Sequence, residues 1–290
     1  MNDKNKSLLK YIEEAREKKV AIGHFNISNI EGFWATVNAS KELNVPVIIG
    51  VSEGERDFIG IREISAIVKN YREYTNLPVF LNADHTYSFD RVKEVVDAGF
   101  DSIIFDGAEL PFEKNIEITK QCVEYAKSKN TQILVEGELG FIGKSSKVFD
   151  SVPDGVGKFT TVEEAKTFIK ETNIDMLAPA VGNVHGIIKS GEPSLNINRI
   201  KEISEQIQIP LVLHGASGNS AEDISNAIPA GISIIHINTE LRIAYRNGLI
   251  KSLQENIDEI SPYKYLKGAR NAMQEVIEDK IKLFNKIQNI

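Results

Sequence analysis

Eight short apolar runs, each followed by a segment with helical periodicity, limit most strongly what this chain can fold into. The runs span residues 20–26, 47–52, 78–84, 101–106, 132–139, 175–181, 210–214 and 232–237. Nearly every position in them is apolar, which is typical of parallel strands that are buried on both faces. Eight such repeats without a break in composition predict closure into a (β/α)8 barrel, and 290 residues suit that architecture.

Helices are predicted wherever apolar residues recur three and four positions apart. They lie at 7–18, 31–43, 61–74, 89–98, 112–129, 161–171, 197–206 and 221–227, with two more beyond the eighth strand at 240–255 and 267–288. The helix at 161–171 opens with a capping box, Thr161 followed by Glu164. We therefore expect an α/β TIM barrel with additional C-terminal helices, folded as one domain over residues 1–290. The longest predicted loop, 141–159, has the length of a functional loop.

The overall charge limits the partners. The net charge is −7, from 34 basic and 41 acidic residues, which argues against binding to nucleic acid or to an anionic membrane surface. The sequence shows neither an apolar N-terminal leader nor a run of ~18 apolar residues, so we expect a cytoplasmic protein. The single cysteine, Cys122, lies in a helical pattern and is expected to be a buried thiol.

Three of the apolar runs deliver a histidine at or just past their C-terminal ends. His85 follows Asp84 directly, and His185 and His214 follow later runs. In a barrel these ends meet at one mouth, where catalytic groups sit, and three neutral imidazoles with an open position form a catalytic divalent-metal site. Asp106 and Glu138 also end strands, and either orient the imidazoles or offer an alternative metal position.

Other polar residues in and after the strands indicate a phosphate site and a buried pair of histidines. The glycine-rich stretch 215–218 follows strand seven, and Asn238 with Thr239 opens a helix after strand eight, where barrels often bind phosphate. Lys189 could add a charge there. No lysine lies within a strand core, which favours metal chemistry over a Schiff base. Strand parity places His24 and His236 together inside the barrel, as a polar core pair or with a catalytic role for His236.

At this point the chain resembles the class II, metal-dependent fructose-bisphosphate and tagatose-bisphosphate aldolases over nearly its whole length. The resemblance lies in the motifs His24-Phe25-Asn26, Val51-Ser52-Glu53-Gly54, Asp84-His85, Phe105-Asp106-Gly107, Glu138-Leu139-Gly140, His185-Gly186 with Lys189, His214-Gly215-Ala216-Ser217-Gly218 and Asn238-Thr239-Glu240. It implies that His85, His185 and His214 bind a catalytic zinc ion. It also implies that Asp84 handles the proton on the hydroxyl whose carbon–carbon bond breaks. Glu138 and Asp106 match acids near an alternative metal position.

The resemblance also implies a substrate and a set of groups that bind it. A sugar phosphate would be held by Asn26, Ser52, Gly186, Lys189, Gly215, Ser217, Asn238 and Thr239, with a monovalent cation, Na⁺ or K⁺, at the phosphate. We expect cleavage of fructose 1,6-bisphosphate to dihydroxyacetone phosphate and glyceraldehyde 3-phosphate by a homodimer or homotetramer. The alternatives are tagatose 1,6-bisphosphate or another ketose phosphate, a sugar-phosphate epimerase, or a non-catalytic barrel that binds metal and sugar phosphate. Several divalent metals other than zinc suit imidazole ligands.

Three positions depart from the family's pattern. The stretch 144–147 reads Lys-Ser-Ser-Lys, where many relatives carry an acid that is proposed to move a proton at the enediolate carbon. Asp150 and Asp154 are the alternative acids in the same loop. His236 stands where the family usually has asparagine, and it is our candidate to replace that acid. Tyr263 stands where an arginine would reach the second phosphate in a neighbouring subunit.

Overall fold

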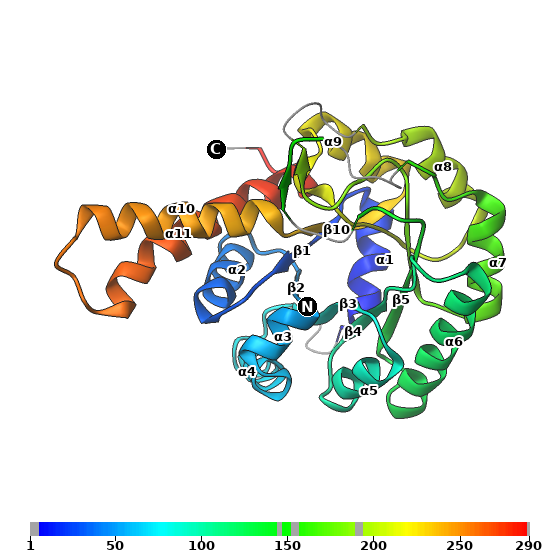
Figure 1. Ribbon diagram of the computed structural model, residues 1–290, viewed down its shortest axis with the longest axis horizontal. Coiled ribbons are helices and arrows are strands. Elements are labelled where there is room, and N and C mark those ends of the chain that lie inside the picture. The colour runs from blue at the N-terminus through cyan, green and yellow to red at the C-terminus, as the bar shows by residue number, and fades with distance from the viewer. Residues whose placement is uncertain (1–5, 144–146, 152–156, 189–193, 289–290) are drawn as a thin grey trace.

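The computed structural model describes residues 6–143, 147–151, 157–188 and 194–288. Eight parallel strands close into a barrel in the order β1-β10-β9-β7-β5-β4-β3-β2, and β2 pairs with β1 to complete the ring. The strands are β1 (Ile22–Asn26), β2 (Val47–Val51), β3 (Val79–Thr86), β4 (Ser102–Phe105), β5 (Leu134–Leu139), β7 (Met176–Pro179), β9 (Leu211–Leu213) and β10 (Ile232–Ile237). The predicted (β/α)8 barrel is therefore confirmed (Figure 1).

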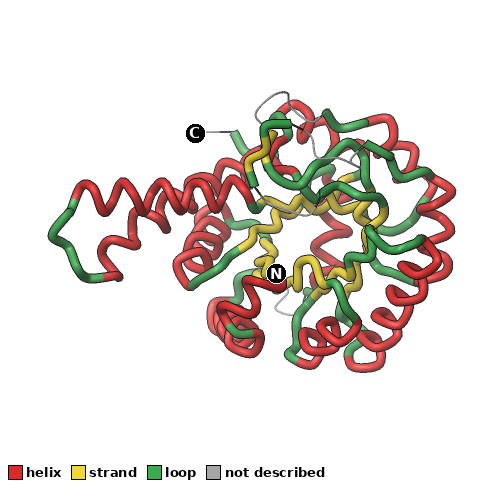
Figure 2. The backbone as a smooth tube through the Cα atoms, viewed as in Figure 1, coloured by secondary structure: helices red, strands yellow, loops and turns green. Residues whose placement is uncertain are grey.

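Helices surround this barrel on the outside, as the backbone tube shows (Figure 2). They are α2 (Ile30–Leu43), α3 (Glu53–Ile59), α4 (Ile61–Thr75), α5 (Phe89–Asp97), α6 (Phe112–Lys129), α7 (Val162–Thr172), α8 (Ile197–Gln206) and α9 (Ala221–Ala230). The capping box that opens α7 is present, since Thr161 and Glu164 exchange side-chain and backbone hydrogen bonds. Cys122 is fully buried on α6, as predicted.

Inside the barrel, side chains form an apolar lower layer and a polar upper layer. The helix α1 (Leu8–Lys18) lies across the N-terminal end of the strands, and its Leu8 and Ile12 pack against strand residues that face inward, such as Ile22 and Ile48. Two residues further along β1, the side chain on the same face is His24. The polar groups of the lumen therefore sit between an apolar floor and the C-terminal mouth.

Four elements differ from the sequence-based expectation. A short helix, α3, begins where a loop was predicted, because Ser52 and Glu55 form a capping box at its start. Two residues of the long loop, β6 (Val148–Phe149), pair with β8 (Ile187–Ile188) in a small parallel sheet. The last helix, α11 (Pro262–Asn285), begins five residues earlier than 267, with proline at a position of the first turn that needs no N–H.

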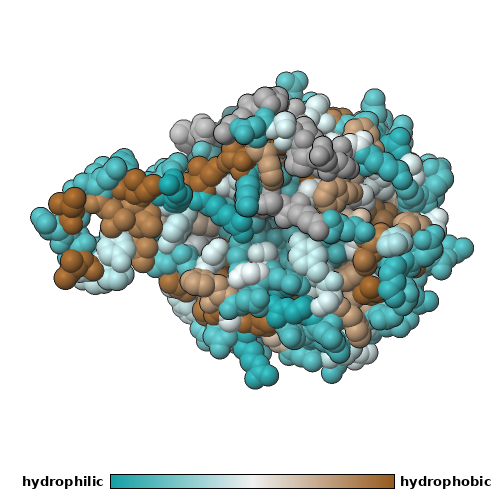
Figure 3. All heavy atoms as spheres, viewed as in Figure 1, coloured by the Kyte–Doolittle hydropathy of each residue, from teal (hydrophilic) through white to brown (hydrophobic). Residues whose placement is uncertain are grey.

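The additional C-terminal helices form an arm. α10 (Thr239–Glu255) and α11 lie side by side and project away from the barrel (Figure 1). The two helices approach closely, since a Cβ on Gly248 would lie 2.5 Å from the Gly268 carbonyl oxygen. Apolar residues gather at the outer end of the arm (Figure 3), where Ile257 and Ile260 are 86% and 87% exposed. Among the described helices, none has the length and apolar character needed to span a bilayer.

Candidate metal centre

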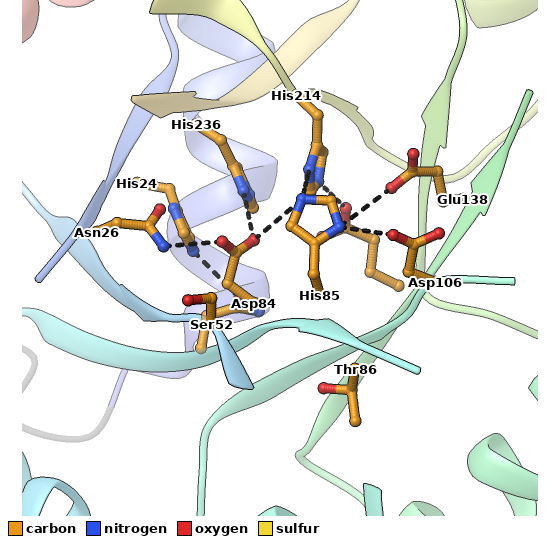
Figure 4. Close-up of polar contacts among 12 residues, drawn as sticks. His24, Asn26, Ser52, Asp84, His85, Thr86, Asp106, Glu138, His214 and His236 are labelled. Carbon is orange, nitrogen blue, oxygen red and sulfur yellow. Dashed lines mark hydrogen bonds and ion pairs between the residues drawn. The ribbon is translucent and has the colours of Figure 1, made fainter. Parts of the chain in front are cut away.

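The three predicted histidines converge at the mouth of the barrel. The ring centroids of His85 and His185 are 4.6 Å apart, those of His85 and His214 are 4.9 Å apart, and those of His185 and His214 are 6.0 Å apart. His85, the last residue but one of β3, has a φ of +39°, a strained backbone conformation for a histidine. That turn directs its ring toward His214 (Figure 4).

Hydrogen bonds on the far edges of two rings fix which nitrogens face each other. Asp106 accepts a hydrogen bond from Nδ1 of His85 at 2.8 Å, and Glu136 accepts one from Nε2 of His214 at 2.7 Å. The remaining nitrogens, His85 Nε2 and His214 Nδ1, face each other at 3.2 Å. That distance suits either a proton shared between them or one metal ion that both nitrogens bind.

Several observations show that a divalent metal fits here. His85, Glu138, His185 and His214 each offer a ligand atom, and these atoms lie within 4.8 Å of one another. Glu138 Oε2 and His185 Nε2 are buried without a hydrogen-bond partner, and such orphaned atoms are uncommon in proteins. Two nitrogens on one tetrahedral zinc ion lie about 3.3 Å apart, close to the spacing of the facing nitrogens.

The charges of the site also favour a cation. Burial alone would lower the pKa of His85, but the nearby carboxylates, Asp84 first, raise it to about 10. Burial and the neighbouring charge of Asp106 raise the pKa of Glu138 well above its usual value. The carboxylates around these side chains therefore favour a positive charge at this position.

Asp84 lies beside this cluster with its carboxylate held from both sides. Asn26 Nδ2 donates a hydrogen bond to Oδ2 at 2.8 Å, and His236 Nδ1 lies 3.3 Å from Oδ1. Burial opposes ionisation of this carboxyl, yet the charge of His85 and the contact with His236 hold its pKa well below the usual range. Asp84 is thus a carboxylate, and its oxygens face the pocket at the mouth.

The predicted meeting of His24 and His236 inside the barrel is confirmed. The two residues are paired in register across β1 and β10, and their rings stack in parallel with centroids 3.4 Å apart. His24 is fully buried, and His236 is 6% exposed and lines the pocket. The catalytic role of His236 stays a prediction.

Most of the predicted phosphate-binding residues surround the same pocket. Its walls comprise Asn26, Asp84, His85, His185, Gly186, His214, Gly215, Ser217, His236, Asn238 and Thr239. Gly215 has a φ of +64°, and a Cβ there would lie 2.6 Å from backbone atoms of Val184, so the close approach of these loops requires glycine. The N-terminus of α10 opens at Thr239, where its free N–H groups can face an anion.

Ser52 is the described member of the predicted substrate set that lies outside the pocket. Its hydroxyl donates to Glu55 Oε2 at 2.9 Å. Lys189 falls outside the described residues, as do Asp154 and positions 144–146 of the long loop. Asp106 is outside the group of four potential ligands, and its Oδ2 accepts a hydrogen bond from His85. Tyr263 is 71% exposed on the arm.

Sequence reasoning missed four supporting residues. Glu55 is buried and accepts hydrogen bonds from Asn26 and Arg242. Arg56 is fully buried and donates to the Asp84 carbonyl oxygen at 3.0 Å. Asn183 donates to the His214 carbonyl oxygen at 3.0 Å and so ties together the loops that carry two of the histidines. Glu136 lies two residues before Glu138 on β5 and so shares its strand face. That alternation is a signal from which Glu136 could have been predicted.

The fold and this site together define a (β/α)8-barrel enzyme with a candidate divalent-metal centre at the mouth. A family model described as fructose-bisphosphate aldolase class-II matches residues 6–289. The chain belongs to the class II fructose-bisphosphate aldolase family, whose members depend on a metal ion. The resemblance seen in the sequence motifs is thereby confirmed.

Individual relatives agree with this assignment. The chain is 40% identical over 281 residues to a fructose-bisphosphate aldolase of Staphylococcus epidermidis, covering 96% of each chain. It is 38% identical over 281 residues to one from Geobacillus stearothermophilus, again covering 96% of each. Among solved structures it is similar to the YdjI aldolase from Escherichia coli K12, with a TM-score of 0.82, 32% identity and 96% of each chain covered.

Proposed function

We propose that this protein is an aldehyde-lyase that cleaves fructose 1,6-bisphosphate into dihydroxyacetone phosphate and glyceraldehyde 3-phosphate, and catalyses the reverse condensation. The observation that carries the proposal is the convergence of His85, His185 and His214 beside the ionised Asp84. Membership of the class II family and relatives that are named fructose-bisphosphate aldolase support this substrate.

The metal would be held by His85, His185 and His214, with Glu138 as a further ligand at an alternative position. Asp106 would hold His85 in the tautomer that leaves Nε2 free, as carboxylates do behind metal-bound imidazoles. When bound, the ion acts as a Lewis acid that polarises the substrate ketone and stabilises negative charge on the three-carbon product. Zinc is our proposal for its identity, since a three-imidazole set is a common zinc site.

Asp84 is the proposed general base. In cleavage it takes the proton of the C4 hydroxyl, the C3–C4 bond breaks, C4 becomes the aldehyde carbon, and the electron pair stays on the C3 side. In condensation the same carboxyl returns the proton. His236 is the proposed second catalytic group and would move the proton at C3, because it lines the pocket and adjoins Asp84.

The phosphate of the three-carbon half would lie against Gly186, Gly215, Ser217, Asn238 and Thr239. Ser217 already accepts a hydrogen bond from the Asn238 N–H at 3.2 Å, which joins the two loops into one wall. Asn26 also lines the pocket and would contact the sugar hydroxyls. Three parts of the substrate site stay predictions. They are a contact of Lys189 with the phosphate, a contact of Ser52 with the sugar, and a Na⁺ or K⁺ ion at the phosphate.

The test is release of triose phosphate from fructose 1,6-bisphosphate in a coupled assay. We expect activity that is lost after chelation and restored by zinc, with metal analysis of the protein as purified to identify the ion. Absence of triose phosphate release by the zinc-loaded protein would refute the substrate. Tagatose 1,6-bisphosphate, which differs only at C4, and ketose monophosphates would then be assayed in the same way, and only an aldolase would release triose phosphate from any of them.

A homodimer or homotetramer is the proposed assembly. The arm formed by α10 and α11 supports it, because apolar residues such as Ile257 and Ile260 are exposed at its outer end. Light scattering coupled to size-exclusion chromatography measures the mass directly, and a monomer at micromolar concentration would refute the proposal. A cytoplasmic location stays a prediction from the sequence.

A further inference from the structure

The stacked imidazoles of His24 and His236 lie beneath Asp84. We propose that His24 is a positioning residue, which fixes the plane of the His236 ring and thereby the hydrogen bond from His236 to Asp84. The proposal rests on the proposed function, in which Asp84 is the general base. It gives a task to a fully buried histidine that does not line the pocket.

The first support is the geometry of the stack. The interplanar angle between the two rings is 1° and their centroids are 3.4 Å apart. A ring in parallel contact over its whole face cannot rotate about its χ2 bond without separating from the other.

The second support is that His24 is itself held in place. Asn82 Nδ2 donates a hydrogen bond to Ser102 Oγ at 2.8 Å, which leaves Asn82 Oδ1 as the acceptor for Nε2 of His24 at 3.1 Å. That contact sets the tautomer of His24, with the proton on Nε2. Nδ1 of His24 is buried without a partner, so a single hydrogen bond fixes the in-plane orientation of this ring.

The third support is the space provided for the ring by a neighbouring strand. A Cβ on Gly50 of β2 would lie 1.9 Å from Cε1 of His24. Gly50 does not have a left-handed φ, so its backbone conformation gives no reason for glycine. The side chain is absent because the imidazole occupies its place.

The consequence for Asp84 follows from how its carboxylate is held. Asn26 donates to Oδ2 at 2.8 Å, whereas Nδ1 of His236 is 3.3 Å from Oδ1 and near the limit of a hydrogen bond. A small rotation of the His236 ring breaks that contact. Without the stack, Asp84 would keep one of its two side-chain donors and could turn away from the substrate hydroxyl.

The kinetic test compares His24→Ala with His24→Phe, which keeps a flat ring against His236. We expect kcat for fructose 1,6-bisphosphate to fall about 10- to 100-fold in the alanine variant. The phenylalanine variant should stay within about threefold of the unaltered protein, because aromatic stacking is retained. KM and bound metal should be unchanged in both. Ile22→Ala, which opens a cavity one layer lower on the same face of β1, is the matched control and should leave kcat unaltered.

A double-mutant cycle shows whether His24 acts through His236. If it does, His24→Ala combined with His236→Ala lowers kcat no further than His236→Ala alone. The proposal would be overturned if the losses of kcat from His24→Ala and His236→Ala add in full in the double variant. It would also be overturned if His24→Ala and His24→Phe lower kcat equally. Far-ultraviolet circular dichroism and metal analysis on each variant separate these results from unfolding and from damage to His214, which also contacts His236.

A readout independent of activity comes from ¹⁵N-labelled histidine, since the chain has five histidines. We expect the Nδ1–H tautomer at His236 and the Nε2–H tautomer at His24. Gly50→Ala, which displaces the His24 ring from a different strand, should replace the His236 signal by a mixture of tautomers. An unchanged His236 signal in that variant would contradict the inference. If the unaltered protein lacks aldolase activity, the proposed function fails while this measurement still tests the stack.

Discussion

Asp106 offers a direct test of the metal centre, because it contacts His85 without being one of the four potential ligands. Asp106→Asn keeps an oxygen that can accept from Nδ1 of His85 and removes the charge, whereas Asp106→Ala removes both. A hydrogen bond to a charged group contributes about 1.5–3 kcal/mol, and this carboxylate is only 13% exposed, so solvent screens it little. We expect metal affinity to fall about 10-fold in the asparagine variant and about 100-fold in the alanine variant, or about 1.4 and 2.7 kcal/mol.

The assay is competition for zinc between the protein and a chromophoric chelator of known affinity, at fixed pH. Asp101→Asn is the matched control, because Asp101 lies at the opposite end of the barrel beside Arg72 and is also paired. Its zinc affinity should equal that of the unaltered protein. Equal affinities for all three variants and the unaltered protein would refute the reasoning that Asp106 supports a metal ligand. A larger loss in the asparagine than in the alanine variant would do the same.

Three further predictions concern other parts of the molecule. Gly215→Ala should lower the melting temperature and the zinc affinity. The left-handed φ of this position costs about 1–2 kcal/mol for alanine, and the new Cβ would lie 2.6 Å from backbone atoms of the neighbouring loop. Gly54→Ala is the control and should change neither quantity, because a Cβ at Gly54 has no atom within 4 Å. Zinc affinity should rise about tenfold per pH unit from pH 6 to 9, because the carboxylates around His85 raise its pKa to about 10 and metal must displace that proton; a flat profile in calorimetric titrations would contradict this. Ile257→Asp with Ile260→Asp should lower the mass measured by light scattering to that of a smaller assembly, and an unchanged mass would show that the exposed end of the arm lies outside the subunit contact.

The barrel and the centre of the site were predictable because their signals are local. Each buried strand is a short apolar run, and each of the three histidines stands at the end of one, so topology alone brings them together. The contact between His24 and His236 followed from strand parity in the same way. These predictions needed the strand order and the two-residue repeat, and they needed no knowledge of side-chain packing.

What was missed depends on packing or on very short elements. Gly54 made the start of α3 resemble a loop, which concealed Glu55 as the group that binds Asn26 and Arg242. Two-residue strands such as β6 and β8 are too short to show any periodicity. The hydrogen bond from Asn183 to the backbone of His214 joins two loops, and a single sequence contains no signal for such a contact.

The arm and the pocket share one helix. α10 begins at Thr239 on the pocket wall and runs out along the arm to Glu255. An α-helix of this length behaves as a stiff rod, so a tilt imposed on its outer end is carried to the pocket wall at Thr239. Any partner that binds the arm more tightly in one tilt than another is therefore linked to substrate affinity, and by reciprocity the substrate alters the affinity of the arm for that partner. If that partner is a second copy of the chain, as proposed above, the saturation curve of the enzyme depends on its own concentration, and saturation curves measured at several protein concentrations test this.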